Sequence, residues 1–301
     1  GPKIVTTICL AATALYCFSY LLIGSIAVFY IVVALGYIFN NGINNVTCGA
    51  IVANWFPRKK GVMLGIATIG LPLSAALGIP LLSLLSSSFN LPWAMFILGI
   101  ICVLFLIFNE LWLKNRPEEI DLTPDGDEMT EEEILALRES IKNFKSELTV
   151  KKLFADKNTW LIGISYGILL CVVAAVMGQL VPYLISIGYA QPKAVSMMSL
   201  TAIVGIIGSY FWGWLDTKIS TKVASVAICL WMTMGMIVLS LTSKNPAIAV
   251  IACIIVGFSN GGFTNLAQSM IAQSYGRYDF AQANSVIGTI QALIRSLGFV
   301  F

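Results

Sequence analysis

The sequence has no histidine and little charge, because only 11% of its 301 residues are Asp, Glu, Lys or Arg. The missing histidine excludes histidine-dependent triads, histidine zinc sites and histidine proton relays. The seven cysteines lie singly with no Cys-x-x-Cys spacing, so we interpret them as small core side chains and expect neither a metal site nor a cofactor. A soluble domain of this length needs roughly 25% charged residues to cover its surface. The composition therefore does not fit a soluble protein.

What the sequence does contain is apolar residues, which make up 58% of the chain and give a mean hydropathy of +0.87. Apolar stretches of about 20 residues, long enough to cross a bilayer, recur along the whole chain. A soluble enzyme with a membrane anchor would confine such stretches to one end. We therefore predict an all-α, multi-pass membrane protein. Its nine expected spans are 4–23, 26–54, 61–86, 91–113, 159–186, 194–214, 223–242, 246–274 and 280–301.

Lysine and arginine are distributed very unevenly between the two sides of these spans. One side receives Lys3, Arg58, Lys59, Lys60, the polar segment 114–158, Lys218, Lys222 and Arg277. The other side receives only Lys193 and Lys244. Because Lys and Arg are enriched in cytoplasmic loops, the rich side is predicted to be cytoplasmic. We expect an integral protein of the cell or cytoplasmic membrane, with loops 57–61 and 114–158 in the cytoplasm.

The polar segment 114–158 contains an expected amphipathic helix. Thr130 followed by Glu133 fits a capping box at a helix start. Apolar residues then recur at helical spacing, at Ile134, Leu137, Ile141, Phe144 and Leu148. We interpret the segment as a linker lying on the inner membrane surface, with regulatory docking as the alternative.

A separation of 219 residues recurs between landmarks on the cytoplasmic side. It relates Lys3 to Lys222, Arg58 to Arg277, and Asn41–Gly42 to Asn260–Gly261. A unit of six spans keeps both copies in the same orientation, so this is a parallel repeat that predicts twelve spans in all. The 301 residues would then hold helices three to eleven, truncated at both ends. The expected parts are 1–113 (helices three to six), the linker 114–158, and 159–301 (helices seven to eleven).

Three loop sequences resemble the major facilitator superfamily. Gly1–Pro2–Lys3 looks like the tail of its loop motif. The run from Gly213 to Lys222 looks like a degenerate copy, in which the usual aspartate and the following glycine are displaced or lost at Thr217 and Ser220. The run Asn54–Gly61 resembles the oxalate/formate antiporter-like and monocarboxylate-porter-like members. The resemblance implies two six-helix halves around a central cavity, working by alternating access. It also implies a gate-stabilising role for the loop residues Lys3, Arg58, Lys59, Asp216, Lys218, Lys222 and Arg277.

The segment 61–86 carries an unusual number of glycines and prolines. They are Gly61, Gly65, Gly70, Pro72, Gly78 and Pro80. Small residues let helices approach closely and prolines favour kinks. This pattern suits a bundle whose halves rock, although it is common in membrane proteins.

Arg295 is the one charged residue well inside a predicted span. Charge in hydrocarbon costs roughly 2.5–3.5 kcal/mol on insertion scales, so such a residue points to function. Asn284, Gly288, Gln291 and Arg295 share one helical face. A guanidinium offers a carboxylate two parallel donors. Our hypothesis is that Arg295, with Gln291, binds the anionic group of a substrate. The alternative is an arginine near the outer end that pairs with backbone or lipid.

Further polar residues inside spans are candidates for lining a substrate cavity, or for bonding one helix to another. They are Asn41, Asn44, Asn260, Gln268, Gln179 and Tyr183. In the oxalate/formate group, basic residues on helices eight and eleven are expected to hold a dicarboxylate. Aligned on Phe211–Gly213, this chain has Ser209 in place of the helix-eight arginine. One cation instead of two favours a monoanion.

We therefore expect a secondary transporter of a small organic anion, a monocarboxylate before a dicarboxylate such as oxalate, acting as antiporter or symporter. There is no Walker-type phosphate loop, so nucleotide hydrolysis is not expected. The expected partners are the anion, the bilayer and a coupling ion or counter-substrate, with no nucleic acid and a monomeric state. The alternatives are a transporter of a neutral or drug-like solute, a membrane-embedded enzyme, and a sensor that does not transport.

Overall fold

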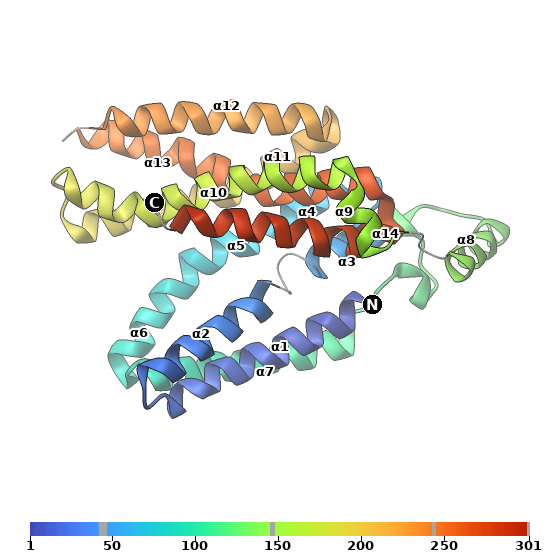
Figure 1. Ribbon diagram of the computed structural model, residues 1–301, viewed down its shortest axis with the longest axis horizontal. Coiled ribbons are helices and arrows are strands. Elements are labelled where there is room, and N and C mark those ends of the chain that lie inside the picture. The colour runs from blue at the N-terminus through green and yellow to red at the C-terminus, as the bar shows by residue number, and fades with distance from the viewer. Residues whose placement is uncertain (42–46, 145–147, 243–244, 300–301) are drawn as a thin grey trace. The chain divides into compact units, whose positions relative to one another are not determined.

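The computed structural model covers residues 1–301 and describes 1–41, 47–144, 148–242 and 245–299. Every regular element in these described ranges is a helix (Figure 1). The contacts group the chain into two compact units, and each is described by itself. The first comprises Gly1–Pro57 with Leu77–Ser146, and the second comprises Arg58–Ala76 with Glu147–Phe301.

The first unit is built on the packing of its first helix against its last long one. Its elements are α1 (Pro2–Ser19), η1 (Tyr20–Leu22), α2 (Ile26–Asn41), α3 (Cys48–Trp55), α6 (Ile79–Phe89), α7 (Leu91–Trp112), η4 (Pro117–Ile120), η5 (Pro124–Gly126) and α8 (Glu131–Asn143). Gly99 of α7 lets α1 approach closely, since a Cβ built there would lie 2.5 Å from the Phe18 ring. The Phe18 and Phe96 rings then pack with centroids 5.1 Å apart.

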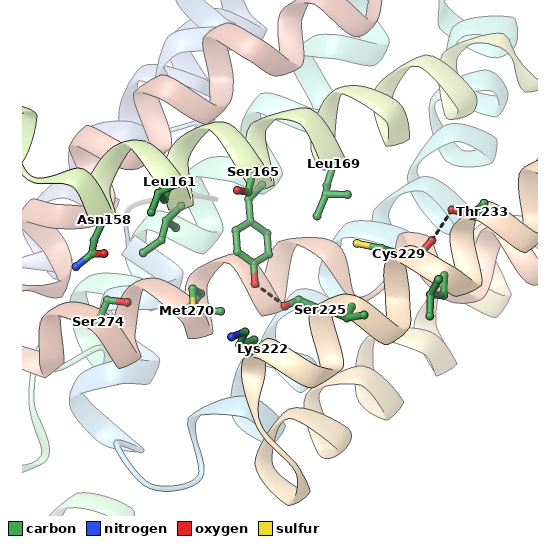
Figure 2. Close-up of a pocket in the computed structure, with 14 residues that line it drawn as sticks. Asn158, Leu161, Ser165, Leu169, Lys222, Ser225, Cys229, Thr233, Met270 and Ser274 are labelled. Carbon is green, nitrogen blue, oxygen red and sulfur yellow. Dashed lines mark hydrogen bonds between the residues drawn. The ribbon is translucent and has the colours of Figure 1, made fainter.

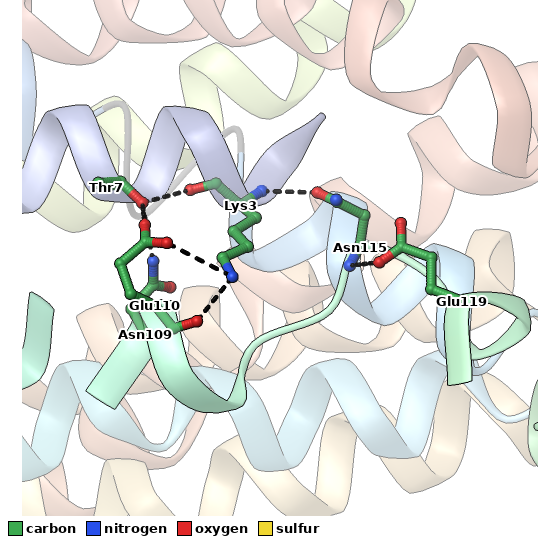
Figure 3. Close-up of polar contacts among 6 residues, drawn as sticks. All are labelled: Lys3, Thr7, Asn109, Glu110, Asn115 and Glu119. Atoms are coloured by element: carbon green, nitrogen blue, oxygen red, sulfur yellow. Dashed lines mark hydrogen bonds and ion pairs between the residues drawn. The ribbon is translucent and has the colours of Figure 1, made fainter. Parts of the chain in front are cut away.

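A polar cluster joins the same two helices at their other end (Figure 3). Lys3 Nζ lies 3.4 Å from a carboxylate oxygen of Glu110 and donates to the Glu110 carbonyl at 2.7 Å. Thr7 donates to the same carboxylate and accepts a hydrogen bond from Asn109. The Lys3 backbone amide donates to Asn115 Oδ1 at 2.8 Å. The predicted loop residue Lys3 thus ties the start of α1 to the end of α7.

The second unit gathers the remaining helices around α11. Its elements are α4 (Lys60–Thr68), α5 (Gly70–Leu73), η3 (Ser74–Gly78, partly), α9 (Val150–Ala155), α10 (Lys157–Ser186), α11 (Gln191–Lys218), α12 (Thr221–Ser240), α13 (Pro246–Asn260), α14 (Phe263–Ser296) and η6 (Leu297–Phe299). α11 packs on α13 and on α4, and α10 packs on α14.

Seven helical segments among the described residues are long and apolar enough to cross a membrane. One of them runs from Pro246 to Ser296, and its 51 residues would extend about 77 Å as one straight helix. Gly276, with φ 70° and ψ 177°, breaks it within α14, and the ribbon turns back there (Figure 1). This segment therefore accommodates the last two predicted spans. The predicted span 26–54 falls on α2, on residues 42–46 outside the description, and on α3.

The 219-residue offset found in the loops also relates helices. Adding 219 to the residue numbers of α1 gives nearly the bounds of α12. Adding 219 to those of α2 gives the bounds of α13 within about a residue at each end. The same offset moves α3 and α4 onto the two halves of α14, on either side of Gly276. The repeat is therefore a property of the secondary structure as well as of a few residues.

The amphipathic helix of the linker begins where the sequence predicts and ends earlier. Thr130 and Glu133 form the expected capping box, with both reciprocal hydrogen bonds. α8 ends at Asn143, however, because Phe144 has extended backbone. The predicted apolar stripe running to Leu148 is therefore too long. The side chains of Leu137 and Ile141 lie outside the described part of the chain.

The capping box gives a pH-dependent prediction. Hydrogen bonds from the Thr130 backbone and hydroxyl hold the pKa of Glu133 below its ordinary value. A carboxylate stabilised in the helix contributes fully above the ordinary glutamate pKa of about 4.3, and the contribution is lost as pH falls below it. Circular dichroism of a peptide spanning 127–144 should show this loss of helix. Thr130→Ala should cost about 0.5–2 kcal/mol of helix stability at neutral pH.

Glu132 provides the matched control, since it lies exposed in the same first turn. Glu133→Ala should remove more of the pH dependence than Glu132→Ala does. Equal effects of the two substitutions would mean that general helix-terminus charge, and not the cap, sets the pH dependence.

Candidate functional site

Small residues bring α4 and α11 into backbone contact. A Cβ built on Gly65 would lie 2.7 Å from the Ser209 carbonyl oxygen, and one on Gly213 would lie 2.4 Å from that of Gly61. Gly61 and Gly65 are four residues apart on α4, and Ser209 and Gly213 are four apart on α11. This spacing places small residues one above another on each helix face, which permits a close crossing. The Val62 amide adds a hydrogen bond to Thr217 Oγ1 at 3.2 Å.

Asp216 lies buried at this crossing, beside α14. One carboxylate oxygen accepts a hydrogen bond from Ser269 Oγ at 2.6 Å. The other is buried without a hydrogen-bond partner among the described residues. Gly61 leaves room for the carboxylate, because a Cβ there would lie 2.5 Å from it. A buried carboxylate at a helix crossing is costly, so any movement that separates α4 from α11 changes its environment.

In the structure, the residues predicted to bind an anion lie along one face of α14. Asn284 and Gln291 are buried on it, Gly288 is half-buried, and Arg295 is half-buried one turn beyond Gln291. A Cβ built on Gly288 would meet no described atom within 4 Å, so this part of the face borders open space.

Two donors on that face lack partners within the described residues. The Gln291 amide nitrogen is buried without a hydrogen bond. The Arg295 guanidinium has no hydrogen bond or ion pair to another described residue. The neighbouring face packs on α10, where Gly163 and Gly167 receive Ile290 and Ile294. Arg295 therefore stands beside the α10 contact and not inside it.

The other predicted polar residues have varied surroundings. Ser209 is fully buried and donates to the Gly205 and Gly261 carbonyls, and Tyr183 donates to the Leu239 carbonyl at 2.9 Å. Gln268 is buried and has an interaction within the protein, whereas Gln179 is exposed on α10. Asn260 is half-buried at the end of α13. The Asn41 side chain and Asn44 lie outside the described part of the chain. Among the described candidates, Gln291 and Arg295 lie one turn apart on the same face of α14.

The predicted loop cations lie at the ends of helices. Arg58, Lys59, Lys218 and Lys222 are exposed. Arg277 follows the break in α14 and packs over the Tyr278 ring at 4.9 Å. Within the described ranges, no group of three or more Cys, Asp or Glu side chains could hold a metal ion.

Ser269, which the sequence does not single out, and Asn265, one of the polar residues inside the predicted span 246–274, join α14 to α11. Ser269 holds Asp216, and the Asn265 amide donates to the Ser209 carbonyl at 2.9 Å. Both lie more than 50 positions from their partners, so no local spacing in the sequence points to them.

The whole arrangement can be compared with known proteins. A family model described as Major Facilitator Superfamily matches residues 1–299. The chain belongs to the major facilitator superfamily. The predicted helical bundle of this superfamily type is thereby confirmed.

Individual relatives of this superfamily member are distant. Monocarboxylate transporter 12 of Rattus norvegicus is 24% identical over 269 residues, covering 81% of this chain and 53% of the relative. The same transporter of Homo sapiens is 22% identical over 265 residues, covering 81% and 50%. This chain thus spans about half the length of the curated relatives it matches. The crystal structure of the human organic anion transporter MFSD10 (TETRAN) matches with a TM-score of 0.71 at 14% identity, covering 100% of this chain and 70% of that one. At this identity the likeness concerns the fold alone.

Proposed function

We propose that this protein is a membrane transporter, and not an enzyme, that moves a small organic anion across the bilayer by alternating access. Membership of the superfamily supports transport as the activity. The name of monocarboxylate transporter 12 favours an anionic substrate. The observation that carries the proposal is the half-buried guanidinium of Arg295 on the Gln291 face of α14, without a partner among the described residues.

The chemistry of that face favours a monocarboxylate. A carboxylate can accept two parallel hydrogen bonds from one guanidinium, and the Gln291 amide nitrogen supplies another donor close by on the same face. One guanidinium balances one negative charge. A dicarboxylate such as oxalate would require a second cation, and Ser209, at the position expected for it, is neutral and engaged with α11 and α13.

The proposal includes the coupling, the oligomeric state and the orientation in the membrane. Transport would proceed by exchange or symport with a coupling ion or counter-substrate, without nucleotide hydrolysis, in a monomeric protein. Loops 57–61 and 114–158 would face the cytoplasm, as their lysine and arginine residues favour. A membrane-impermeant thiol reagent applied to cysteines placed in 114–158 would check this orientation.

Uptake into proteoliposomes containing the full-length protein tests the substrate class. Radiolabelled L-lactate is expected to enter saturably and at least about tenfold faster than lactamide, its uncharged analogue, since one lost charge-assisted contact is worth about 1.4 kcal/mol or more. Oxalate should enter more slowly than lactate. Faster entry of lactamide would favour a neutral substrate, and no uptake of any small anion would remove the carboxylate proposal.

A further inference from the structure

Two cysteines that are distant in the sequence meet between α1 and α7 of the first unit. The Cys17 thiol on α1 and the Cys102 thiol on α7 hydrogen-bond to each other, and both are free thiols. Cys17 is buried in the helix contact, whereas Cys102 is half-buried and can be reached from outside it. The fold therefore brings together two sulfur atoms that no Cys-x-x-Cys spacing relates.

The packing of the two helices places the sulfur atoms together. A Cβ built on Gly99 would lie 3.2 Å from Cys17 Cβ, so α7 presents its bare backbone to Cys17 at that level. Cys102 follows Gly99 by three positions, which puts it on the same side of α7 in the next turn. In the preceding turn the Phe18 and Phe96 rings pack with centroids 5.1 Å apart. The thiol contact is therefore part of a packed helix crossing.

We propose that Cys17 and Cys102 form a redox modification site, at which an organic hydroperoxide converts the two thiols into a disulfide that joins α1 to α7. Both helices are long and apolar enough to cross a membrane, so the oxidant must be able to enter hydrocarbon. A lipid hydroperoxide meets this requirement.

The oxidation proceeds in two steps that balance. Cys102 is the more accessible thiol and reacts first. Its sulfur attacks the terminal peroxide oxygen, the O–O bond breaks, and an alcohol leaves with the Cys102 proton. The Cys17 sulfur then attacks the resulting sulfenic acid on Cys102, the S–O bond breaks, and water leaves with the Cys17 proton. The two thiols lose two electrons, which the hydroperoxide gains.

A neighbouring thiol decides the fate of an oxidised cysteine. A sulfenic acid beside a thiol closes to a reducible disulfide, whereas one without a thiol can proceed irreversibly to sulfinic and sulfonic acids. Cys229 provides the contrast, because it is half-buried like Cys102 but lies on the wall of an apolar groove between α10, α12 and α14 (Figure 2). No other described residue that lines this groove is a cysteine. Cys229 is therefore the matched control.

Treatment of the full-length protein in proteoliposomes with cumene hydroperoxide tests the site. The protein is then denatured, its remaining thiols are alkylated, and its peptides are analysed by mass spectrometry without reduction. A peptide pair linked through Cys17 and Cys102 is expected, lighter by two hydrogen atoms than its two reduced peptides together. Dithiothreitol should abolish the link. Cys229 should be found alkylated or as an oxygen acid, and not in a disulfide.

Cys17→Ser tests whether Cys17 is the second thiol. Dimedone, which traps sulfenic acids, should label Cys102 at least about tenfold more in this variant than in the parent, because a thiol held in contact outcompetes a reagent in solution. Labelling of Cys229 should be the same in both. The oxidised parent should also melt at a higher temperature than the reduced parent, since the disulfide constrains the unfolded chain. Cys17→Ser should show no such shift.

Three results would overturn the proposal. The first is recovery of both Cys17 and Cys102 as alkylated thiols under conditions that oxidise Cys229, which is measured in the parent and needs no variant to fold. The second is a disulfide from Cys102 to another protein molecule in place of the link to Cys17. The third is equal dimedone labelling of Cys102 with and without Cys17.

Discussion

Arg295→Gln is expected to reduce anion uptake by at least about 30-fold while leaving the amount of protein in the membrane unchanged. Removing one member of a desolvated, hydrogen-bonded charge pair costs about 2–5 kcal/mol, and 1.4 kcal/mol corresponds to tenfold. Arg295→Lys should fall between the parent and the glutamine variant, because an ammonium keeps the charge but loses the two parallel donors. Initial rates of L-lactate uptake into proteoliposomes measure both.

Lys193→Gln is the matched control for the loss of a cation. Lys193 is exposed in the first turn of α11, with Nζ 5.5 Å from the centre of the Tyr189 ring. It should transport nearly as well as the parent. If Arg295→Gln transported at the parent rate, or if Lys193→Gln were equally impaired, Arg295 would have a structural role or one shared by any cation. The proposed substrate contact would then be wrong.

Gly65→Ala is expected to drive α4 away from α11 and to impair transport. The added Cβ would lie 2.7 Å from the Ser209 carbonyl and 3.2 Å from Gly213 Cα, and both neighbours are backbone atoms that cannot rotate away. Overpacking of this kind typically costs about 1–3 kcal/mol, which lowers the population of the packed arrangement by about 5- to 150-fold. Since alternating access requires helices to meet and separate, loss of one packed arrangement should slow the cycle.

The rate of disulfide formation between Val62→Cys and Thr217→Cys reports that packing, because the Val62 amide and Thr217 Oγ1 are 3.2 Å apart. Gly70→Ala is the matched control, since it adds the same methyl five residues further on. A Cβ built there meets no described atom within 4 Å. Gly70→Ala should cross-link and transport like the parent. Indistinguishable results for the two alanine variants would show that the α4–α11 crossing does not depend on Gly65.

Several features could be predicted because their physical causes act locally along the chain. Few charges and recurring apolar stretches require a membrane, since the peptide groups of each span must be satisfied within a helix. The capping box at Thr130 depends on atoms only three residues apart, and the structure confirms it. The repeat predicted from the loops extends to the helices, because the same offset relates α1 to α12 and α2 to α13.

The sequence alone determined that this is a helical membrane protein with an internal repeat and a face of α14 bearing Gln291 and Arg295. Only the tertiary structure decided which side chains meet across helices. Gly65 and Gly70 look alike in the sequence, yet a Cβ built on Gly65 would meet the Ser209 carbonyl and one built on Gly70 would meet no described atom within 4 Å. Likewise, Ser269 reaches Asp216 across 53 positions. Helix crossings depend on many small packing contacts between distant segments, and no local pattern encodes their sum.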